Sequence, residues 1–260
     1  MKSNAFFVMM KEKGKGEKIN LKKRVFSFFF ILCTGIFIFC AWKLYQYYHA
    51  YHQAGQEYQE IREKGKETTE EKEIDFDGLK EINPDLVGWI YMEGTKIDYP
   101  IVKSHDNEEY LNRTFQGTSN RSGAIFMDKN CEEGFGSDNS VIYGHHMRDG
   151  SMFADLMKFR KSSFVEKNND VILYTPQKTI QLKVIASYAA KGDTKIPVMF
   201  ANEDEKESYI ADILKKSDIS AGLSAADQKK IKKLYTFVTC SYEEEDNRTF
   251  VYAVESDDIS

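Results

Sequence analysis

The sequence predicts a mainly β protein, an eight-stranded closed barrel or sandwich preceded by one membrane-spanning helix. Three observations support this prediction. A charge-free run lies near the N-terminus, eight short apolar runs separated by turn residues follow it, and one long helix-patterned insertion precedes the last two runs. With 30% charged and 42% hydrophobic residues over 260 positions, the chain has the composition of a folded protein with one main domain.

The charge-free run is residues 25–42, VFSFFFILCTGIFIFCAW. As a helix its 18 residues cover about 27 Å, close to the thickness of the hydrocarbon core of a bilayer. The basic arm before it, residues 1–24, holds eight Lys and Arg against two Glu, a net charge of +6, which predicts a cytoplasmic N-terminus and an extracellular C-terminal part. A cleavable signal peptide is the alternative, but the run is long for one and no small-x-small cleavage site follows it. We therefore expect an uncleaved anchor in the cell membrane.

The charge outside the arm argues against nucleic acid as a partner. Subtracting +6 from the total of −5 leaves −11 for the remaining chain, whereas a phosphate-binding surface needs clustered Lys and Arg. Of the four cysteines, Cys33 and Cys40 lie in the apolar run, and Cys131 and Cys240 lie in the exported part. The sequence has no CxxC or HExxH spacing, so we expect no metal site and no cofactor.

Residues 43–73 are polar and rich in Glu and Lys, which favours a juxtamembrane helix or spacer. The packed extracellular domain is expected over residues 74–260. It begins with a short helical pattern, because Phe76 and Leu79 recur at helical spacing before Pro84 ends the segment.

Alternating apolar residues bounded by Gly, Asn and Asp predict the strands of this domain. The predicted strands are residues 87–91, 97–102, 123–127, 140–143, 171–175, 179–188, 234–240 and 249–254. Closure into a barrel is favoured because it leaves no unpaired edge. Helical spacing predicts helices over 106–115, over 151–159 and within the insertion 201–233. That insertion is either a substrate-selecting wall or a simple cover of the barrel.

Three residue types that suit one reaction stand at the ends of predicted strands: His145 in VIYGHHM, Cys240 in TFVTC and Arg248 in NRTF. A thiolate attacks a carbonyl, a histidine passes a proton to the leaving amine, and a guanidinium stabilises the developing oxyanion. Acyl transfer uses all three. Taken singly, each has a plain structural alternative: a turn histidine, a buried thiol, and an arginine in a surface ion pair. The acidic run 243–246 is interpreted as a solvated turn, or as an attractor for a cationic acceptor.

The sequence resembles class B sortases through several motifs together. TFVTC with the downstream Arg248 is similar to the sortase signature TLxTC and its arginine, with Phe237 in place of Leu. The segments NPDLVGWIYMEGTKIDYPIV, DNEEYLNRTF, GAIFMD, NSVIYGHHMRDGSMF and TCSYEEEDNRTFVYA extend the resemblance over residues 80–255. The resemblance implies a membrane-tethered cysteine transpeptidase of a Gram-positive bacterium, with an eight-stranded β-barrel, N-terminal helices and a helix in the connection before the strand that carries Cys240.

By that resemblance Cys240 is the nucleophile, His145 the acid and base, and Arg248 the stabiliser of the oxyanion or substrate. His145 is the matching histidine because it directly follows the glycine, whereas His146 would point the other way on a strand. The substrate-binding positions of class B sortases correspond to Asn107, Leu111, Tyr143 and Ser241.

The resemblance also implies the partners. Secreted proteins with a C-terminal sorting signal, LPxTG-like or NPxTN-like, would be cleaved through a thioester and joined to an amine of peptidoglycan or of its lipid-linked precursor. Three alternatives stay open. A pilin-polymerising sortase shares the chemistry but takes a pilin lysine as acceptor. A Cys-His cell-wall amidase places its cysteine before its histidine, opposite to the order here, and a tethered binding module would keep Cys240 merely buried.

Overall fold

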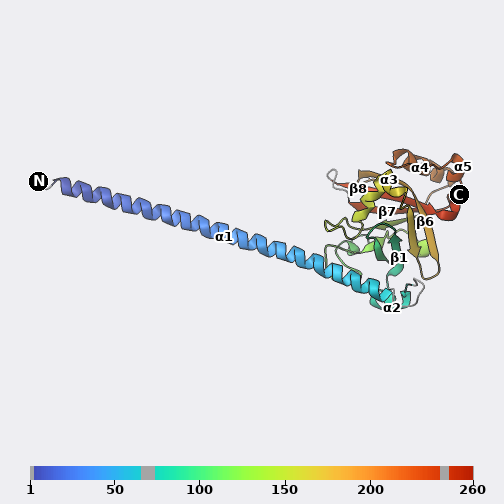
Figure 1. Cartoon of the computed structure of the whole chain (residues 1–260), viewed down its shortest axis with the longest axis horizontal. Coiled ribbons are helices and arrows are strands. Elements are labelled where there is room, and N and C mark those ends of the chain that lie inside the picture. Colours follow the sequence, from blue (N-terminus) through green and yellow to red (C-terminus); the bar gives the residue numbers. More distant parts are fainter. Residues whose placement is uncertain (1–2, 66–73, 241–245, 260) are drawn as a thin grey trace. The chain divides into compact units, whose positions relative to one another are not determined.

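The computed structural model of the whole chain describes residues 3–65, 74–240 and 246–259, and of residues 3–20 and Cys240 it describes the backbone alone. The chain divides into two compact units, Met1–His52 and Gln53–Ser260. The N-terminal unit is formed by helix α1 (Ser3–Gly65), whose last turns belong to the second unit (Figure 1). Among the described residues, α1 is the one helix long and apolar enough to cross a membrane, with a mean hydropathy of 2.3 in its most apolar stretch.

The second unit is a closed barrel, which confirms the predicted fold class. Within the described residues its strands follow one another around the barrel in the order β1, β2, β3, β4, β7, β8, β6 and β5. They are β1 (Leu86–Met92), β2 (Asp98–Lys103), β3 (Ile125–Met127), β4 (Asn139–Tyr143), β5 (Asp170–Tyr174), β6 (Thr179–Lys191), β7 (Leu234–Cys240) and β8 (Asn247–Glu255). The pairs β2–β3 and β4–β7 are parallel, and the other neighbours are antiparallel. Because β5 pairs with β1, no sheet edge is left open.

The core fills the barrel with large apolar side chains. Trp89, Phe237 and Tyr252 are fully buried, and the ring of Phe237 packs edge-on against Phe153 with 6.4 Å between centroids. Strand β5 alternates buried and half-buried residues, as expected of a strand with one face on the core. From Leu234 to Thr239, β7 is buried at every position, so it lies under other elements on both of its faces.

The packed unit begins earlier than the expected Ile74. Residues 53–65 of α1 bury Ala54, Tyr58 and Ile61, which recur at helical spacing on one face of an otherwise polar segment. The Tyr58 hydroxyl donates to the Gly123 carbonyl at 2.7 Å. The buried Glu57 carboxylate accepts hydrogen bonds from Thr114 Oγ1 at 2.9 Å and from the Gln116 amide at 3.0 Å. The end of α1 therefore braces the loop that precedes β3.

Some of the helices predicted from the sequence form in the structure, and two others are replaced by 3₁₀ elements. The helix α2 (Phe76–Ile82) and, in the long insertion, α4 (Glu203–Lys216) and α5 (Ala225–Gln228) form as predicted. In place of the helix predicted over 151–159 there is a 3₁₀ helix, η3 (Ala154–Arg160), and residues 106–115 hold a single 3₁₀ turn, η1 (Glu109–Leu111). The smaller elements are η2 (Glu133–Phe135), α3 (Ser162–Val165) and η4 (Ser256–Asp258).

Local hydrogen bonding explains why residues 106–115 are not a regular helix. The Asp106 carboxylate accepts from the backbone amides of Glu108 and Glu109, at 2.8 and 2.9 Å, and so ties the chain into a turn. Asn107 adopts a left-handed conformation with φ of 67°, which interrupts a right-handed helix. The prediction of a helix was wrong here because it rested on the spacing of apolar residues, which does not report the Asp106 hydrogen bonds or the left-handed backbone of Asn107.

Candidate active site

The barrel topology gathers the three predicted catalytic residues at one rim. Strands β4 and β7 are parallel neighbours, so their C-terminal ends, which lead to His145 and carry Cys240, lie at the same edge. Strand β8 runs antiparallel to β7, and its register places Arg248 directly opposite Cys240. Residues more than 90 positions apart in sequence thus meet because of strand pairing alone.

A cavity of about 330 Å³ opens at this rim. Its lining combines residues from the β2–β3 loop, from the ends of β4 and β7, and from the start of β8. They are Asp106, Asn107, Glu108, Leu111, Phe126, Tyr143, Gly144, His145, Val238, Thr239 and Arg248. Five of the predicted site residues, Asn107, Leu111, Tyr143, His145 and Arg248, are among them.

The two remaining predicted site residues are Cys240 and Ser241, and the structure describes neither of their side chains. Val238 and Thr239, which line the cavity, lead directly into Cys240, whose backbone is described and whose side chain is not. Ser241 and residues 243–245 of the acidic run lie outside the described residues, and Asp246 is exposed.

The imidazole of His145 has a fixed orientation. Its Nε2 atom lies 2.7 Å from the carbonyl oxygen of Leu111. Because a carbonyl oxygen only accepts hydrogen bonds, Nε2 carries the hydrogen in this contact, and Nδ1 is the ring nitrogen left free of it. The backbone is held as well: the His145 carbonyl accepts from the Phe153 amide at 2.9 Å. Sequence reasoning missed the role of Leu111 here, because it acts through its main chain.

Gly123 makes room for this arrangement. It has a left-handed φ of +59°, and a Cβ at this position would lie 2.9 Å from the Leu111 carbonyl oxygen and 3.0 Å from Cδ2 of His145. A side chain here would therefore crowd both partners of the histidine hydrogen bond. The sequence predicts Gly123 as the first residue of a strand, whereas β3 begins at Ile125 and Gly123 lies before it.

Gly123→Ala is expected to reduce kcat about tenfold, because it displaces the Leu111 carbonyl and costs about 1–2 kcal/mol of backbone strain. The measurement is steady-state peptide cleavage together with the midpoint of thermal unfolding. Gly222→Ala is the matched control, since Gly222 also has a positive φ, +65°, but no atom within 4 Å of the added Cβ. Equal losses of kcat in the two variants would mean that backbone strain alone is responsible.

A buried carboxylate that the sequence analysis did not single out lies under the cavity wall. Asp128, at the end of β3, is 7% exposed, and its Oδ2 accepts from Asn107 Nδ2 at 2.8 Å and from the Tyr143 hydroxyl at 3.2 Å. The Asn107 Oδ1 in turn accepts from the Lys129 amide at 2.8 Å. Burial, and next the Asp128 charge, raise the pKa of Tyr143, so this phenol keeps its proton. The sequence offered one signal for this buried carboxylate, which is that Asp128 directly follows a predicted strand.

The other histidine of the motif is placed differently. The backbone of His146 bridges that of Met152, and the residue does not line the cavity that holds His145. Arg248 is half-buried, and its strand position lies between Cys240 of β7 and Ala190 of β6. The arrangement therefore puts an oriented imidazole and a guanidinium on either side of the Cys240 backbone.

Comparison with known proteins agrees with this architecture. A family model for the sortase domain matches residues 90–256. Sortase B of Staphylococcus aureus is 30% identical over 238 residues, which cover 89% of this chain and 96% of that protein, and sortase B of Listeria monocytogenes is 28% identical over 222 residues, covering 83% and 89%. The crystal structure of sortase B from Bacillus anthracis in complex with AAEK1 has a TM-score of 0.70 at 29% identity, covering 80% of this chain and 99% of that one. The chain therefore belongs to the sortase family, as a cysteine transpeptidase of the sortase B type.

Proposed function

We propose that Cys240 cleaves a C-terminal sorting signal, LPxTG-like or NPxTN-like, on secreted proteins, and that the enzyme joins them to an amine of peptidoglycan or of its lipid-linked precursor. The observation that carries this proposal is the shared rim: the Cys240 backbone lies opposite Arg248 in the β7–β8 register, beside a cavity lined by His145. A cavity of about 330 Å³ suits an extended peptide segment of a few residues.

In the first half-reaction the Cys240 thiolate attacks the carbonyl carbon of the threonine in the signal. The peptide C–N bond breaks, His145 gives a proton to the departing amine, and a thioester remains on the sulfur. Arg248 supplies hydrogen-bond donors to the oxyanion that forms at the carbonyl oxygen. In the second half-reaction His145 takes a proton from the acceptor amine, which attacks the thioester and releases the thiolate.

Asn107, Leu111 and Tyr143 are proposed to bind the signal, with Ser241 beside the nucleophile. The first three line the same cavity as His145, and Leu111 is 36% exposed, which is unusual for a large apolar side chain outside the membrane helix. An exposed leucine at the mouth of a cavity is suited to an apolar side chain of the signal. Phe126 extends this apolar surface inside the cavity.

Residues 25–42 are proposed to anchor the enzyme, with residues 1–24 in the cytoplasm and the catalytic unit outside the cell. The support is the length and hydropathy of α1 and the net charge of +6 before it. This orientation brings the catalytic unit to the side of the membrane where secreted proteins and the cell wall meet.

The test of the whole proposal is single-turnover trapping of the acyl-enzyme. The full-length chain in detergent is mixed with LPxTG-type and NPxTN-type peptides, and the thioester adduct is measured by intact mass. Acceptors are then added in separate arms: a glycine-based peptide amine and a lysine-bearing pilin segment. Resolution by the first alone supports cell-wall attachment, resolution by the second alone supports the pilin-polymerising alternative, and no adduct with any peptide contradicts the proposed substrate class.

Asp128→Asn is expected to raise KM for the cleaved peptide about tenfold with little change in kcat, because an amide has one acceptor oxygen, so its NH2 group must face either the donors of Asn107 and Tyr143 or those of Asn130. Asn130→Ala is the matched control. Asn130 donates to Oδ1 of the same carboxylate, on the side away from Tyr143, with its Nδ2 at 3.0 Å. A rise of KM in both variants alike would show that Asp128 only stabilises the fold.

A further inference from the structure

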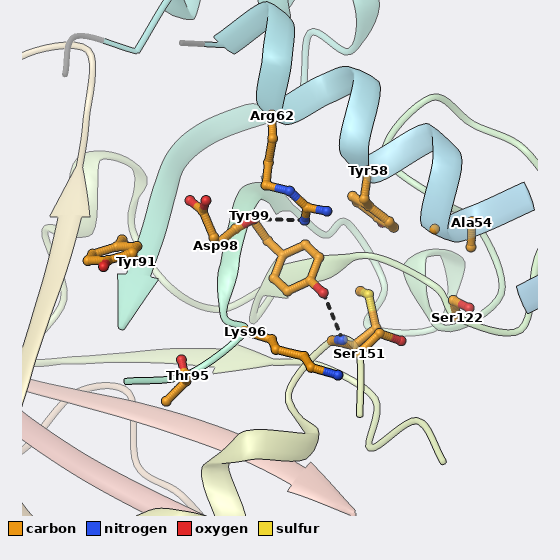
Figure 2. Close-up of a pocket in the computed structure, with 12 residues that line it drawn as sticks. Ala54, Tyr58, Arg62, Tyr91, Thr95, Lys96, Asp98, Tyr99, Ser122 and Ser151 are labelled. Carbon is orange, nitrogen blue, oxygen red and sulfur yellow. Dashed lines mark hydrogen bonds between the residues drawn. The ribbon is translucent and has the colours of Figure 1, made fainter. Parts of the chain in front are cut away.

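A second cavity, of about 390 Å³, lies apart from the catalytic one, with which it shares no lining residue. Four segments of the second unit enclose it: residues 54–62 at the end of α1, residues 91–99 from the end of β1 to the start of β2, Ser122 before β3, and residues 151–152 before η3 (Figure 2). Its volume is within the range of small-ligand sites, roughly 300–1,000 Å³. None of these residues contacts the reacting groups of the proposed acyl transfer, although Tyr58 also supports Gly123.

Two cationic side chains from different elements share this cavity. The Arg62 guanidinium stands over the Tyr99 ring at 5.6 Å, and its Nη1 makes only a long contact of 3.4 Å to the Asp98 carbonyl oxygen. The Lys96 ammonium lies 3.4 Å from the Asp149 carbonyl oxygen. In the described part of the chain neither cation forms a salt bridge with a carboxylate.

One carboxylate also lines the cavity, and it is already engaged. Asp98 accepts a hydrogen bond from the Trp89 indole at 2.7 Å. Figure 2 shows this carboxylate turned toward Tyr91, away from the charged ends of Arg62 and Lys96. The charge that faces the cavity is therefore positive, with two cations against one carboxylate directed elsewhere.

Buried hydroxyl groups add hydrogen-bond donors. Tyr99 is 4% exposed and its oxygen accepts from the Met152 amide at 3.0 Å, while its own hydrogen has no acceptor among the described residues. Burial raises the pKa of Tyr99, so the phenol keeps that hydrogen. Ser122 is 2% exposed and also lines the cavity, so its hydroxyl adds a second donor. Two hydroxyl groups from largely buried residues thus line a cavity that also holds two cations.

We propose that this cavity binds a phosphoryl group, carried by a membrane lipid or by a soluble phosphate compound. A phosphoryl group offers several oxygen acceptors and a negative charge, which match the guanidinium, ammonium and hydroxyl donors. The lining begins twelve residues after Trp42, the end of the predicted membrane span, so the tether between the two is short. Lipid headgroups are the phosphates concentrated at a membrane surface.

The experiment uses the full-length chain in a maltoside detergent, which carries no phosphate. Isothermal titration calorimetry and ³¹P line broadening measure the binding of three probes: inorganic pyrophosphate, dihexanoyl-phosphatidylglycerol and dihexanoyl-phosphatidylcholine. The test variant is Arg62→Gln with Lys96→Gln. The matched control, Lys178→Gln with Lys216→Gln, removes the same charge from exposed positions outside the cavity. The basic arm is present in every variant, so its own attraction for anions cancels in the comparison.

We expect the cavity variant to bind the favoured probe at least tenfold more weakly than the wild type, with the control within about twofold. Ser122→Ala, which leaves the charge unchanged, is expected to weaken binding by a smaller factor. Binding of pyrophosphate alone identifies a soluble phosphate as the source, and binding of the short-chain lipids identifies a headgroup. Absence of binding by the wild type, or equal affinities of wild type and cavity variant, overturns the proposal. Unchanged peptide cleavage and thermal unfolding verify that the cavity variant is folded.

Discussion

Replacing Cys240 by alanine is expected to abolish both cleavage of a sorting-signal peptide and the thioester adduct, a loss of more than about a thousandfold in kcat. The reason is that Cys240 is the only thiol at the rim in the described or predicted site, and the hydroxyls of Thr239 and Ser241 are much weaker nucleophiles than a thiolate. The measurement is peptide cleavage followed by chromatography, with intact mass for the adduct. Retained turnover in this variant would remove Cys240 as the nucleophile.

Cys131 offers the matched control for that experiment. It is buried, 4% exposed, its sulfur accepts a hydrogen bond from the Val141 amide at 3.3 Å, and burial raises the pKa of its thiol. A buried thiol kept in its protonated form is a poor nucleophile. Cys131→Ser is therefore expected to keep peptide cleavage within a few-fold of the wild type. A methanethiosulfonate reagent should modify Cys240 and leave Cys131 unmodified in the folded chain, whereas a tethered binding module with a buried Cys240 would leave both unmodified.

The strands were predictable because each apolar run is bounded by turn residues. The pattern left a closed barrel or a sandwich open, and the motif resemblance pointed to the barrel. The position of His145, Cys240 and Arg248 at one rim is harder to predict from the sequence. Parallel pairing of β4 with β7 is a non-local contact, and no local pattern in either strand specifies it. The motif resemblance supplied that part of the prediction.

The parts that the sequence did not reveal are those in which main-chain groups or isolated polar residues decide the structure. The end of α1 looks polar, yet three residues on one face bury it against the barrel, so the packed unit starts at Gln53. The loop 106–115 has helical spacing, but the Asp106 side chain competes for the backbone amides. Asp128 is one acid among many in a sequence of 41 Asp and Glu, and its place directly after a strand was the one signal that the sequence offered for its burial.

These same features form one connected support for the histidine. Tyr58 of α1 donates to the Gly123 carbonyl, and Gly123 lies against the Leu111 carbonyl, which accepts from His145. The orientation of the His145 imidazole thus depends on packing of residues 53–65 of α1 onto the barrel. Removal of residues 53–65 would remove this support, so the full-length chain is the form to assay.

Alanine at His145 is expected to lower kcat about a thousandfold or more, whereas alanine at the adjacent His146 should change it by no more than about threefold. His145 lines the cavity, and its Nδ1 is free of the hydrogen bond that its Nε2 donates to Leu111. His146 shares the residue type and the strand end, but it lies outside the cavity lining. The pair is therefore a matched control within one motif, measured by peptide cleavage with thermal unfolding as the check on folding. A larger loss in His146→Ala than in His145→Ala would reverse the assignment, and comparable losses would show that the motif needs both rings to keep its backbone in place.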